Sequence, residues 1–424
     1  MIALPSANAD PAALERARTD RSGAVGAPPR AVVEARSVAE VRAAAEWAHR
    51  HRVPLVARGA GSGLAGGALA DGALVIDLSG LNRILEIDPV DELAIVEPGV
   101  ITADLDAAAR EHELFFAPDP ASAAFSTVGG NIATNAGGLR CVKYGITRDA
   151  VLALDVVLAD GRLIHTGRRT VKGVAGYDLT SLFVGSEGTL GLIVGATVRL
   201  RPVPEATITV AASFPSSEEA AHACTALFAR RVAPSMLELL DDATLGLIGM
   251  DARALVLAQF DGRAAEQEAA IAREALGAGR HDTEALLAVR RQALPSIEAR
   301  GKALIEDICV PRSRLAEAFT RLRAIREQTG AELYTFAHAG DGNLHPILSY
   351  DRALPEPPPN VVEAAERIFA LALELGGTVT GEHGIGSLKR DWLRREQGED
   401  VLAAQAAIKH ALDPRGVLNP GKAI

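Results

Sequence analysis

The stretch Val53-Pro-Leu-Val-Ala-Arg-Gly-Ala-Gly-Ser-Gly-Leu-Ala-Gly-Gly67 decides how the first half of this chain folds. A short apolar run leads into Gly61-x-Gly63-x-x-Gly66, and Asp77 ends the next apolar run, a pattern that superficially matches the dinucleotide fingerprint of a Rossmann unit. A Rossmann crossover needs a helix of about a dozen residues between its strands. Only residues 64–72 are available here, and they contain three glycines, each of which costs a helix roughly 1 kcal/mol. The sequence therefore predicts a glycine-rich loop at this place.

Such a loop can bind an anion, because backbone N–H groups without neighbouring Cβ atoms can converge on a pyrophosphate. A surface loop without a ligand explains this single segment equally well. Two further glycine clusters, at 126–138 and 176–191, favour the ligand. Their asparagine, serine and threonine side chains can hydrogen-bond the edge of a heterocycle.

The length of 424 residues predicts two domains. Two prolines in Arg201-Pro-Val-Pro204 mark the linker, so we expect domains at 1–204 and 205–424. In the first, Ser37 should cap a helix reaching about Arg52, and Thr102 should cap a helix through His112. In the second, a helix is expected over 361–375.

Composition excludes several functions. The formal net charge is −10 and no block of Lys and Arg occurs, which argues against nucleic acid as a partner. The three cysteines are far apart, so they cannot form a disulfide framework or an iron–sulfur site alone. Neither a signal peptide nor an apolar run of 18 residues is present. We expect a soluble, cytoplasmic protein without a transmembrane segment.

Histidines and a carboxylate cluster in two glycine-flanked motifs of the second half. Phe336-Ala-His-Ala-Gly-Asp-Gly-Asn-Leu-His345 carries two histidines, and Thr380-Gly-Glu-His-Gly-Ile-Gly386 places a carboxylate beside a third. Imidazole and carboxylate together suit a divalent metal such as Zn²⁺ or Mn²⁺, and three protein ligands leave positions open for a substrate. One isolated histidine is usually a hydrogen-bonded core or surface residue, but this grouping favours a site.

Taken jointly, the motifs resemble the FAD-linked oxidase family with a flavin domain of the vanillyl-alcohol-oxidase or PCMH type. Within it, the pattern is most similar to glycolate oxidase FAD subunits and flavin D-lactate dehydrogenases. The matching segments are Arg58–Gly63, Gly129–Gly138, Lys143–Gly145, Tyr177–Leu179 and Gly185–Gly191. The resemblance implies an α+β fold, in which a PCMH-type FAD-binding domain of two α+β subdomains precedes a C-terminal α+β domain with an antiparallel sheet.

The resemblance also implies which residues hold FAD. Residues 58–63 would cradle the pyrophosphate, others would line the flavin or contact the nucleotide, and the C-terminal loop would pack near the flavin. The implied set is Arg58, Gly59, Ala60, Gly61, Ser62, Gly63, Pro118, Ser126, Thr127, Gly130, Asn131, Ala133, Asn135, Ala136, Glu187, Gly188, Ile193 and Asn419. Because residues 58–67 contain no histidine, we expect the FAD to be non-covalent.

By the same resemblance, His338, His345 and Glu382 would bind the metal and His383 would be the catalytic base. The metal would lower the pKa of the substrate hydroxyl as a Lewis acid, and His383 would remove its proton. Arg290 would bind the substrate carboxylate bidentately. The competing interpretation is that Arg290 is a solvent-exposed charge on a helix. The expected reaction is oxidation of a D-2-hydroxy acid to the 2-oxo acid, with the hydride passing to the flavin.

Departures from the family pattern narrow the range of expected substrates. Relatives acting on 2-hydroxyglutarate have an asparagine where Ile347 stands and a lysine where Ile305 stands. A second carboxylate on the substrate would therefore lack these polar partners in the protein. This favours a small monocarboxylate such as glycolate or D-lactate as the substrate. Arg140 stands where glycolate oxidase relatives often have histidine.

Two other functions are each compatible with part of the pattern. A non-catalytic FAD-binding or electron-relay subunit of a larger complex gains support from relatives that work beside an iron–sulfur subunit. Such a partner, or another electron acceptor, could also hold the protein at a membrane surface. A metal hydrolase would explain the histidines but leaves the glycine clusters without a role.

Overall fold

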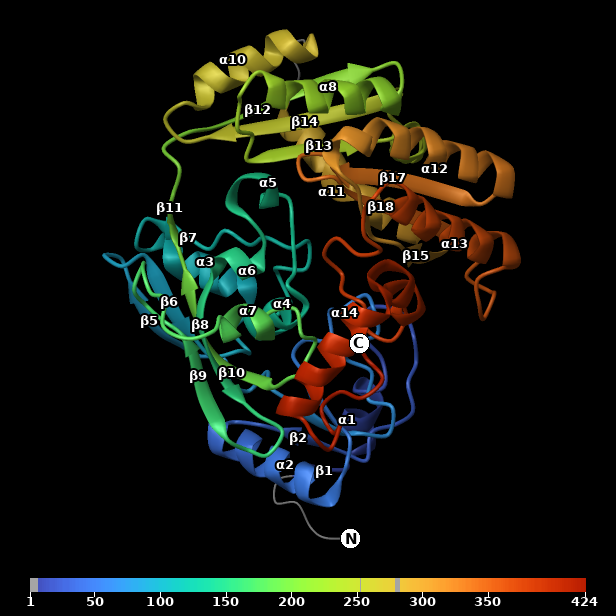
Figure 1. Cartoon of the computed structure of the whole chain (residues 1–424). Helices are drawn as coiled ribbons and strands as arrows, with labels where there is room; N and C mark the ends of the chain where they lie inside the picture. Colours follow the sequence, from blue (N-terminus) through green and yellow to red (C-terminus); the bar gives the residue numbers. More distant parts are fainter. Residues whose placement is uncertain (1–6, 252, 279–282) are drawn as a thin grey trace. The chain divides into compact units, whose positions relative to one another are not determined.

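The computed structural model describes residues 7–251, 253–278 and 283–424, which form two compact units (Figure 1). Unit 1 comprises the chain up to Gly138, Gly145–Val203 and Glu382–Ile424. Unit 2 comprises Leu139–Tyr144 and Pro204–Gly381. The last 43 residues of the chain (382–424) thus pack with the N-terminal half, and a six-residue segment of that half packs with unit 2.

The first sheet of unit 1 carries the glycine loop. Its strand order is β1-β2-β4-β3, and β2, β4 and β3 run parallel. The elements are β1 (Ala7–Asn8), α1 (Pro11–Arg16), β2 (Ala31–Glu34), α2 (Val38–His51), β3 (Leu55–Arg58) and β4 (Leu74–Asp77). No helix occurs between β3 and β4, so the connection is a loop as predicted.

A second, antiparallel sheet completes unit 1, with the order β5-β6-β10-β8-β9. Its strands are β5 (Ile84–Asp88), β6 (Leu93–Val96), β8 (Val151–Val157), β9 (Leu163–Gly167) and β10 (Leu192–Arg199). The other elements are α3 (Thr102–Arg110), β7 (Leu114–Phe115), α4 (Val128–Thr134), α6 (Thr147–Ala150), α7 (Leu179–Phe183), β11 (Arg201–Pro202) and α14 (Arg390–Leu412). Helix α14 is interrupted at Gly398, whose φ is +73°. A hydrophobic core between this sheet, α3 and α4 stabilises the subdomain.

Unit 2 is built on a seven-stranded antiparallel sheet of order β12-β14-β13-β17-β18-β15, with β16 paired to β18. The strands are β12 (Thr207–Phe214), β13 (Met236–Leu240), β14 (Ala254–Asp261), β15 (Lys302–Ile305), β16 (Ile308–Cys309), β17 (Glu332–His338) and β18 (Asn343–Tyr350). The helices are α5 (Cys141–Tyr144), α8 (Ser217–Ala229), α9 (Asp242–Ile248), α10 (Ala265–Leu276), α11 (Thr283–Arg300), the 3₁₀ turn η1 (Arg312–Arg314), α12 (Leu315–Thr329) and α13 (Pro359–Glu374).

Helices cover both faces of this sheet, with α8 and α10 on one side and α11 on the other (Figure 1). The core under α9 and α11 contains Met236, Leu240, Tyr334, Phe336 and Ile347. These residues point to one face because side chains alternate along a strand.

The segment 139–144 is fixed to unit 2 by polar contacts with the end of β14. Lys143 forms an ion pair with Asp261, and the Tyr144 hydroxyl donates to the other Asp261 oxygen at 2.8 Å. A Cβ on Gly340 would collide with Val142, so the segment also approaches the β17–β18 turn closely.

Local expectations about helices were mostly right. Ser37 caps α2 by accepting from the Glu40 N–H, and the helix ends one residue before Arg52, which takes the left-handed conformation. The predicted role of Thr102 as a cap was wrong: Ile101 is the N-cap, and the Thr102 hydroxyl donates to the Ser126 carbonyl. Helix α13 begins two residues earlier than expected because Pro359 suits a first helical turn.

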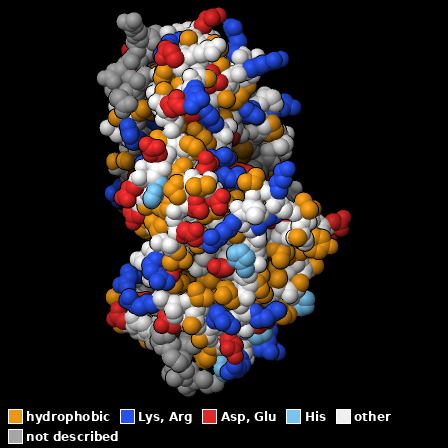
Figure 2. All heavy atoms as spheres, turned by 90° about the vertical axis from the view of Figure 1, so that its left-hand side faces the viewer, with side chains coloured by type: hydrophobic (Ala, Val, Ile, Leu, Met, Phe, Trp, Pro, Cys, Tyr) orange, Lys and Arg blue, Asp and Glu red, His pale blue; other side chains and the backbone are white. Residues whose placement is uncertain are grey.

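Two further observations concern the surface and the helices. On the face in Figure 2, Lys and Arg side chains are interspersed with Asp and Glu. Within the described ranges, none of the helices combines the length and apolarity needed to cross a bilayer. The expectation that the N-terminus is not a signal peptide partly concerns residues 1–6, which lie outside the described residues.

Candidate functional site

A cavity with about 430 Å³ of empty space lies in unit 1 beside the end of β3. Seven of its lining residues belong to the predicted FAD-binding set: Arg58, Gly59, Thr127, Gly130, Ala133, Gly188 and Ile193. Five others were not singled out as contacts: Ala57, Leu78, Pro98, Gly129 and Gly191. Gly129 and Gly191 stand inside the glycine clusters, so their motif could have indicated them. Burial lowers the pKa of Arg58, and the negative charges of Asp20 and Asp77 oppose this shift.

Glycine is required where chain segments meet around this cavity. A Cβ on Gly59 would collide with the Thr127 hydroxyl, and a Cβ on Gly129 would collide with the ring and carbonyl of Pro98. The glycine clusters therefore bring three segments of backbone together at one hollow.

Several predicted contacts hydrogen-bond within the protein instead of lining the cavity. The Asn131 amide donates to Thr102 Oγ1 at 2.6 Å, close to buried Ser126. Asn135 ends α4 in the left-handed conformation and accepts from the Arg148 N–H at 2.9 Å. The remaining predicted residues outside the lining are Ala60, Gly61, Ser62, Gly63, Pro118, Ala136, Glu187 and Asn419.

Glu187 is buried and holds the loop that carries His383. Its two oxygens accept the N–H groups of Ile385 and Gly386, each at 2.8 Å. Burial raises the pKa of this carboxyl, and the two hydrogen bonds oppose the shift. Glu187 thus has backbone partners that the motif alone does not reveal.

Asn419 ties the C-terminal segment to the same loops. Its amide nitrogen donates to the carbonyls of Gly67 at 3.0 Å and Glu187 at 2.7 Å. Its own N–H donates to the Leu55 carbonyl at 2.7 Å. The C-terminal segment is therefore an integral part of unit 1.

Glu382 and His383 lie at the start of this segment. Their side chains are mostly buried, with the His383 Nε2 atom 3.9 Å from a Glu382 oxygen. A Cβ on Gly137 would collide with the Glu382 carboxylate. Within unit 1, Glu382 therefore borders the glycine cluster 126–138.

His338 and His345 lie together on the sheet of unit 2. Their ring centroids are 5.0 Å apart at an interplanar angle of 84°, and both side chains are buried. One ring nitrogen of each lies within 4.8 Å of the other. Two buried imidazoles this close can both bind one divalent ion.

A buried carboxylate connects His338 to Arg290. One oxygen of Glu238 lies 2.6 Å from His338 Nδ1, and the other accepts from Arg290 Nε at 2.6 Å. The guanidinium of Arg290 lies over the Phe336 ring, 4.2 Å from its centroid. Burial opposes ionisation of Glu238, but the charges and hydrogen bonds of His338 and Arg290 outweigh it and hold its pKa below the usual value.

Sequence reasoning missed Glu238 and a second buried carboxylate, Asp307. One Asp307 oxygen lies 3.9 Å from His345 Nδ1, and the other accepts from the Thr380 hydroxyl at 2.8 Å. Each carboxylate reaches its histidine from another strand or loop, so a motif search along the chain could not find it.

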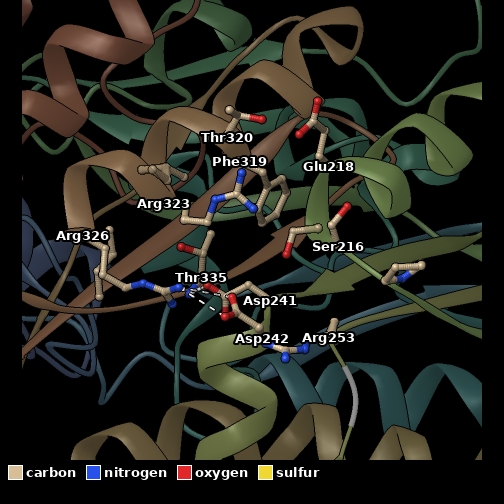
Figure 3. A pocket seen from close by; sticks show the side chains of 14 residues that line it. Ser216, Glu218, Asp241, Asp242, Arg253, Phe319, Thr320, Arg323, Arg326 and Thr335 are labelled. Carbon is tan, nitrogen blue, oxygen red and sulfur yellow. Dashed lines mark hydrogen bonds and ion pairs between the residues drawn. The ribbon is translucent and has the colours of Figure 1, made fainter. Parts of the chain in front are cut away.

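Unit 2 also has a hollow between the start of α8, α12 and β17 (Figure 3). Arg326 and Asp242 form an ion pair there. At its floor, burial raises the pKa of Asp241 to about 6. Both Asp241 oxygens accept backbone N–H groups, from Thr244 at 2.8 Å and Thr335 at 3.0 Å. None of the predicted site residues lines this hollow.

Family comparisons match both halves of the chain. A profile described as "FAD linked oxidases, C-terminal domain" matches residues 203–423, and one described as "FAD binding domain" matches residues 29–167.

Individual proteins are also similar. A protein titled "Glycolate oxidase subunit GlcD" from Bacillus subtilis is 42% identical over 93% of this chain and 88% of its own length. A "D-lactate dehydrogenase" from Anaerostipes hadrus is 36% identical over 93% and 89%. The crystal structure of p-cresol methylhydroxylase superposes with a TM-score of 0.80 at 18% identity, covering 99% of this chain and 93% of the other. The fold is thus of the PCMH type, followed by a C-terminal domain with a large antiparallel sheet.

Proposed function

Since the chain belongs to the FAD-linked oxidases, as a FAD-dependent oxidoreductase of the glycolate oxidase and D-lactate dehydrogenase type, we propose that it oxidises a small D-2-hydroxy acid to the 2-oxo acid. Glycolate and D-lactate are the proposed substrates. The observation that carries this proposal is the buried pair His338 and His345, with Arg290 held beside them through Glu238.

We place part of a non-covalent FAD in the glycine-lined cavity of unit 1, which has about 430 Å³ of empty space. Side chains at Gly59 and Gly129 would collide with neighbouring segments, so backbone groups converge at the cavity. In this proposal residues 1–204 bind the FAD and residues 205–424 supply the substrate side. When bound, FAD supplies the hydride acceptor.

The histidine pair fits a divalent metal such as Zn²⁺ or Mn²⁺, with Glu382 as the third proposed ligand. The metal would act as a Lewis acid on the substrate hydroxyl.

The chain's own residues would bind the substrate and move its proton. Arg290 uses Nε for Glu238, so its terminal amino groups can bind the substrate carboxylate. His383 would accept the hydroxyl proton on a ring nitrogen, as an imidazole can near neutral pH. Burial of His338, His345 and Glu238 keeps water from competing for these groups.

Apolar residues support the choice of a monocarboxylate. Ile305 and Ile347 are paired across β15 and β18, and Ile347 is fully buried in the core under α11. Neither position can bind a second carboxylate, so a dicarboxylic 2-hydroxy acid should be a poor substrate.

An electron-accepting partner follows from the same assignment. The similar proteins from Bacillus subtilis and Escherichia coli are both titled subunits of a glycolate oxidase. We propose that this chain also passes electrons to an iron–sulfur or other acceptor subunit, in the cytoplasm.

Anaerobic mixing of the flavin-loaded protein with single 2-hydroxy acids tests the function. Glycolate or D-lactate should bleach the flavin absorbance, whereas 2-hydroxyglutarate and L-lactate should bleach it slowly or not at all. A flavin that stays oxidised with every monocarboxylate would refute the proposal and favour a non-catalytic electron-relay subunit.

A further inference from the structure

Glu238 is a fully enclosed charged residue beside the histidine pair. Its side chain is 0% exposed, yet one oxygen bonds to the guanidinium of Arg290 and the other to the imidazole of His338. A buried carboxylate costs several kcal/mol in desolvation, which only close and complementary partners can offset. A buried charged group of this kind is therefore expected at places where the position of its partners is important for function.

Sheet register brings Glu238 to this place. Glu238 is the cross-strand partner of His338, and Phe336 is the partner of His345 on the next strand pair. Arg290 comes from α11, on the face of the sheet where Phe336 lies. One carboxylate therefore links a strand histidine to a helix arginine, although the two are 48 residues apart (338 − 290).

We propose that Glu238 is a positioning residue that fixes His338 and Arg290 relative to each other. This role rests on the proposed function, in which His338 binds the metal and Arg290 binds the substrate carboxylate. The substrate carries both its hydroxyl and its carboxylate on the same carbon, C2, so the groups that bind them must keep a fixed separation.

The chemistry at each oxygen supports this role. An ionised carboxylate only accepts hydrogen bonds, so His338 must carry its proton on Nδ1. The lone pair then lies on Nε2, the nitrogen that would face a metal, and such outer partners also raise ligand basicity. On the other side, the bond to Nε and the stacking on Phe336 hold the guanidinium plane, which leaves its terminal amino groups oriented for a carboxylate.

Glu238→Gln in the flavin-loaded full chain tests the proposal. The amide keeps the size but cannot accept from both partners at once. After chelator treatment, Mn²⁺ titration should show about 10- to 100-fold weaker binding than wild type. The KM for glycolate or D-lactate should rise, while flavin content stays the same.

Asp241→Asn is the matched control. Asp241 lies three residues further along, is also buried and also loses a charge, but it bonds to the backbone of Thr244 and Thr335 instead. Its Mn²⁺ affinity and KM should equal those of wild type. If both variants weaken Mn²⁺ binding equally, the effect is a general loss of packing and the proposed role is overturned.

Arg290→Lys provides a second variant should Glu238→Gln fail to fold. Lysine keeps the charge beside Glu238 but lacks the planar fork, so KM should rise with Mn²⁺ affinity unchanged. If wild type binds Mn²⁺ and substrate reduces its flavin, and Glu238→Gln behaves in the same way, the positioning role of Glu238 is refuted. The proposed function then stands. Wild type that neither binds Mn²⁺ nor is reduced would refute the proposed function and this role with it.

Discussion

Glu187→Gln separates two possible roles of a residue next to the glycine-lined cavity of unit 1. From the resemblance to FAD-linked oxidases, we propose Glu187 as a contact of the nucleotide. In the structure its two oxygens instead accept the N–H groups of Ile385 and Gly386, two and three residues after His383. The substitution leaves one of these N–H groups facing an amide NH₂.

The expected cost follows from these two bonds. A hydrogen bond to a charged group contributes about 1.5–3 kcal/mol, and a buried donor left without an acceptor costs about 1–3 kcal/mol. A combined loss of about 2.5–6 kcal/mol would speed amide exchange at Ile385 and Gly386 roughly 60- to 20,000-fold, since 1.4 kcal/mol corresponds to tenfold.

Hydrogen–deuterium exchange, flavin content and anaerobic reduction should be measured on the same sample. We expect faster exchange in the loop and slower flavin reduction, with the flavin retained. Asp413→Asn is the control, because buried Asp413 likewise accepts two backbone N–H groups, from Val417 and Leu418. It should loosen those amides and leave Ile385 and Gly386 protected. Loss of flavin from Glu187→Gln with the loop amides still protected would refute this reasoning and support the nucleotide contact.

Three other predictions follow from single positions. His383→Ala should keep FAD but lose substrate-driven flavin reduction, and unchanged reduction in a stopped-flow experiment would show that another group is the base. Gly61→Val should lower flavin content, because Gly61 has a φ of +68° that a β-branched residue rarely adopts. Because burial raises the Asp241 pKa from 3.8 to about 6, the folded state loses roughly 3 kcal/mol as pH rises from about 4 to 6, and denaturant unfolding of Asp241→Asn should lack this slope.

Local patterns carried the predictions that succeeded. The cap at Ser37 and the glycine loop after β3 depend on neighbouring residues alone, so composition and spacing were sufficient. The misassigned cap at Thr102 shows the limit, because its hydroxyl is used by Ser126 and Asn131, which follow more than twenty residues later.

Long-range packing explains what the sequence did not reveal. The residues next to Glu382 in sequence do not indicate that the chain from Glu382 to Ile424 packs in unit 1. The packing depends on hydrogen bonds of Asn419 and Glu187 to the backbone of loops that are distant in sequence. Glu238 and Asp307 were missed for the same reason. Each is an ordinary acidic residue in sequence and acquires its partner only when the sheet of unit 2 forms.

The spacing between His338 and His345 has a geometric origin that a motif does not express. His338 is paired with Asn343, so His345 lies two residues further along β18 and shares the face of His338. Diagonal neighbours of this kind remain within reach of aromatic rings, as the 5.0 Å centroid distance confirms. An insertion or deletion of one residue in β18 before His345 would turn its ring to the opposite face, away from Glu238 and Arg290. The seven-residue interval between the two histidines therefore reflects the register of the β17–β18 hairpin. The register of β13, β17 and β18 together brings the histidine pair to Glu238.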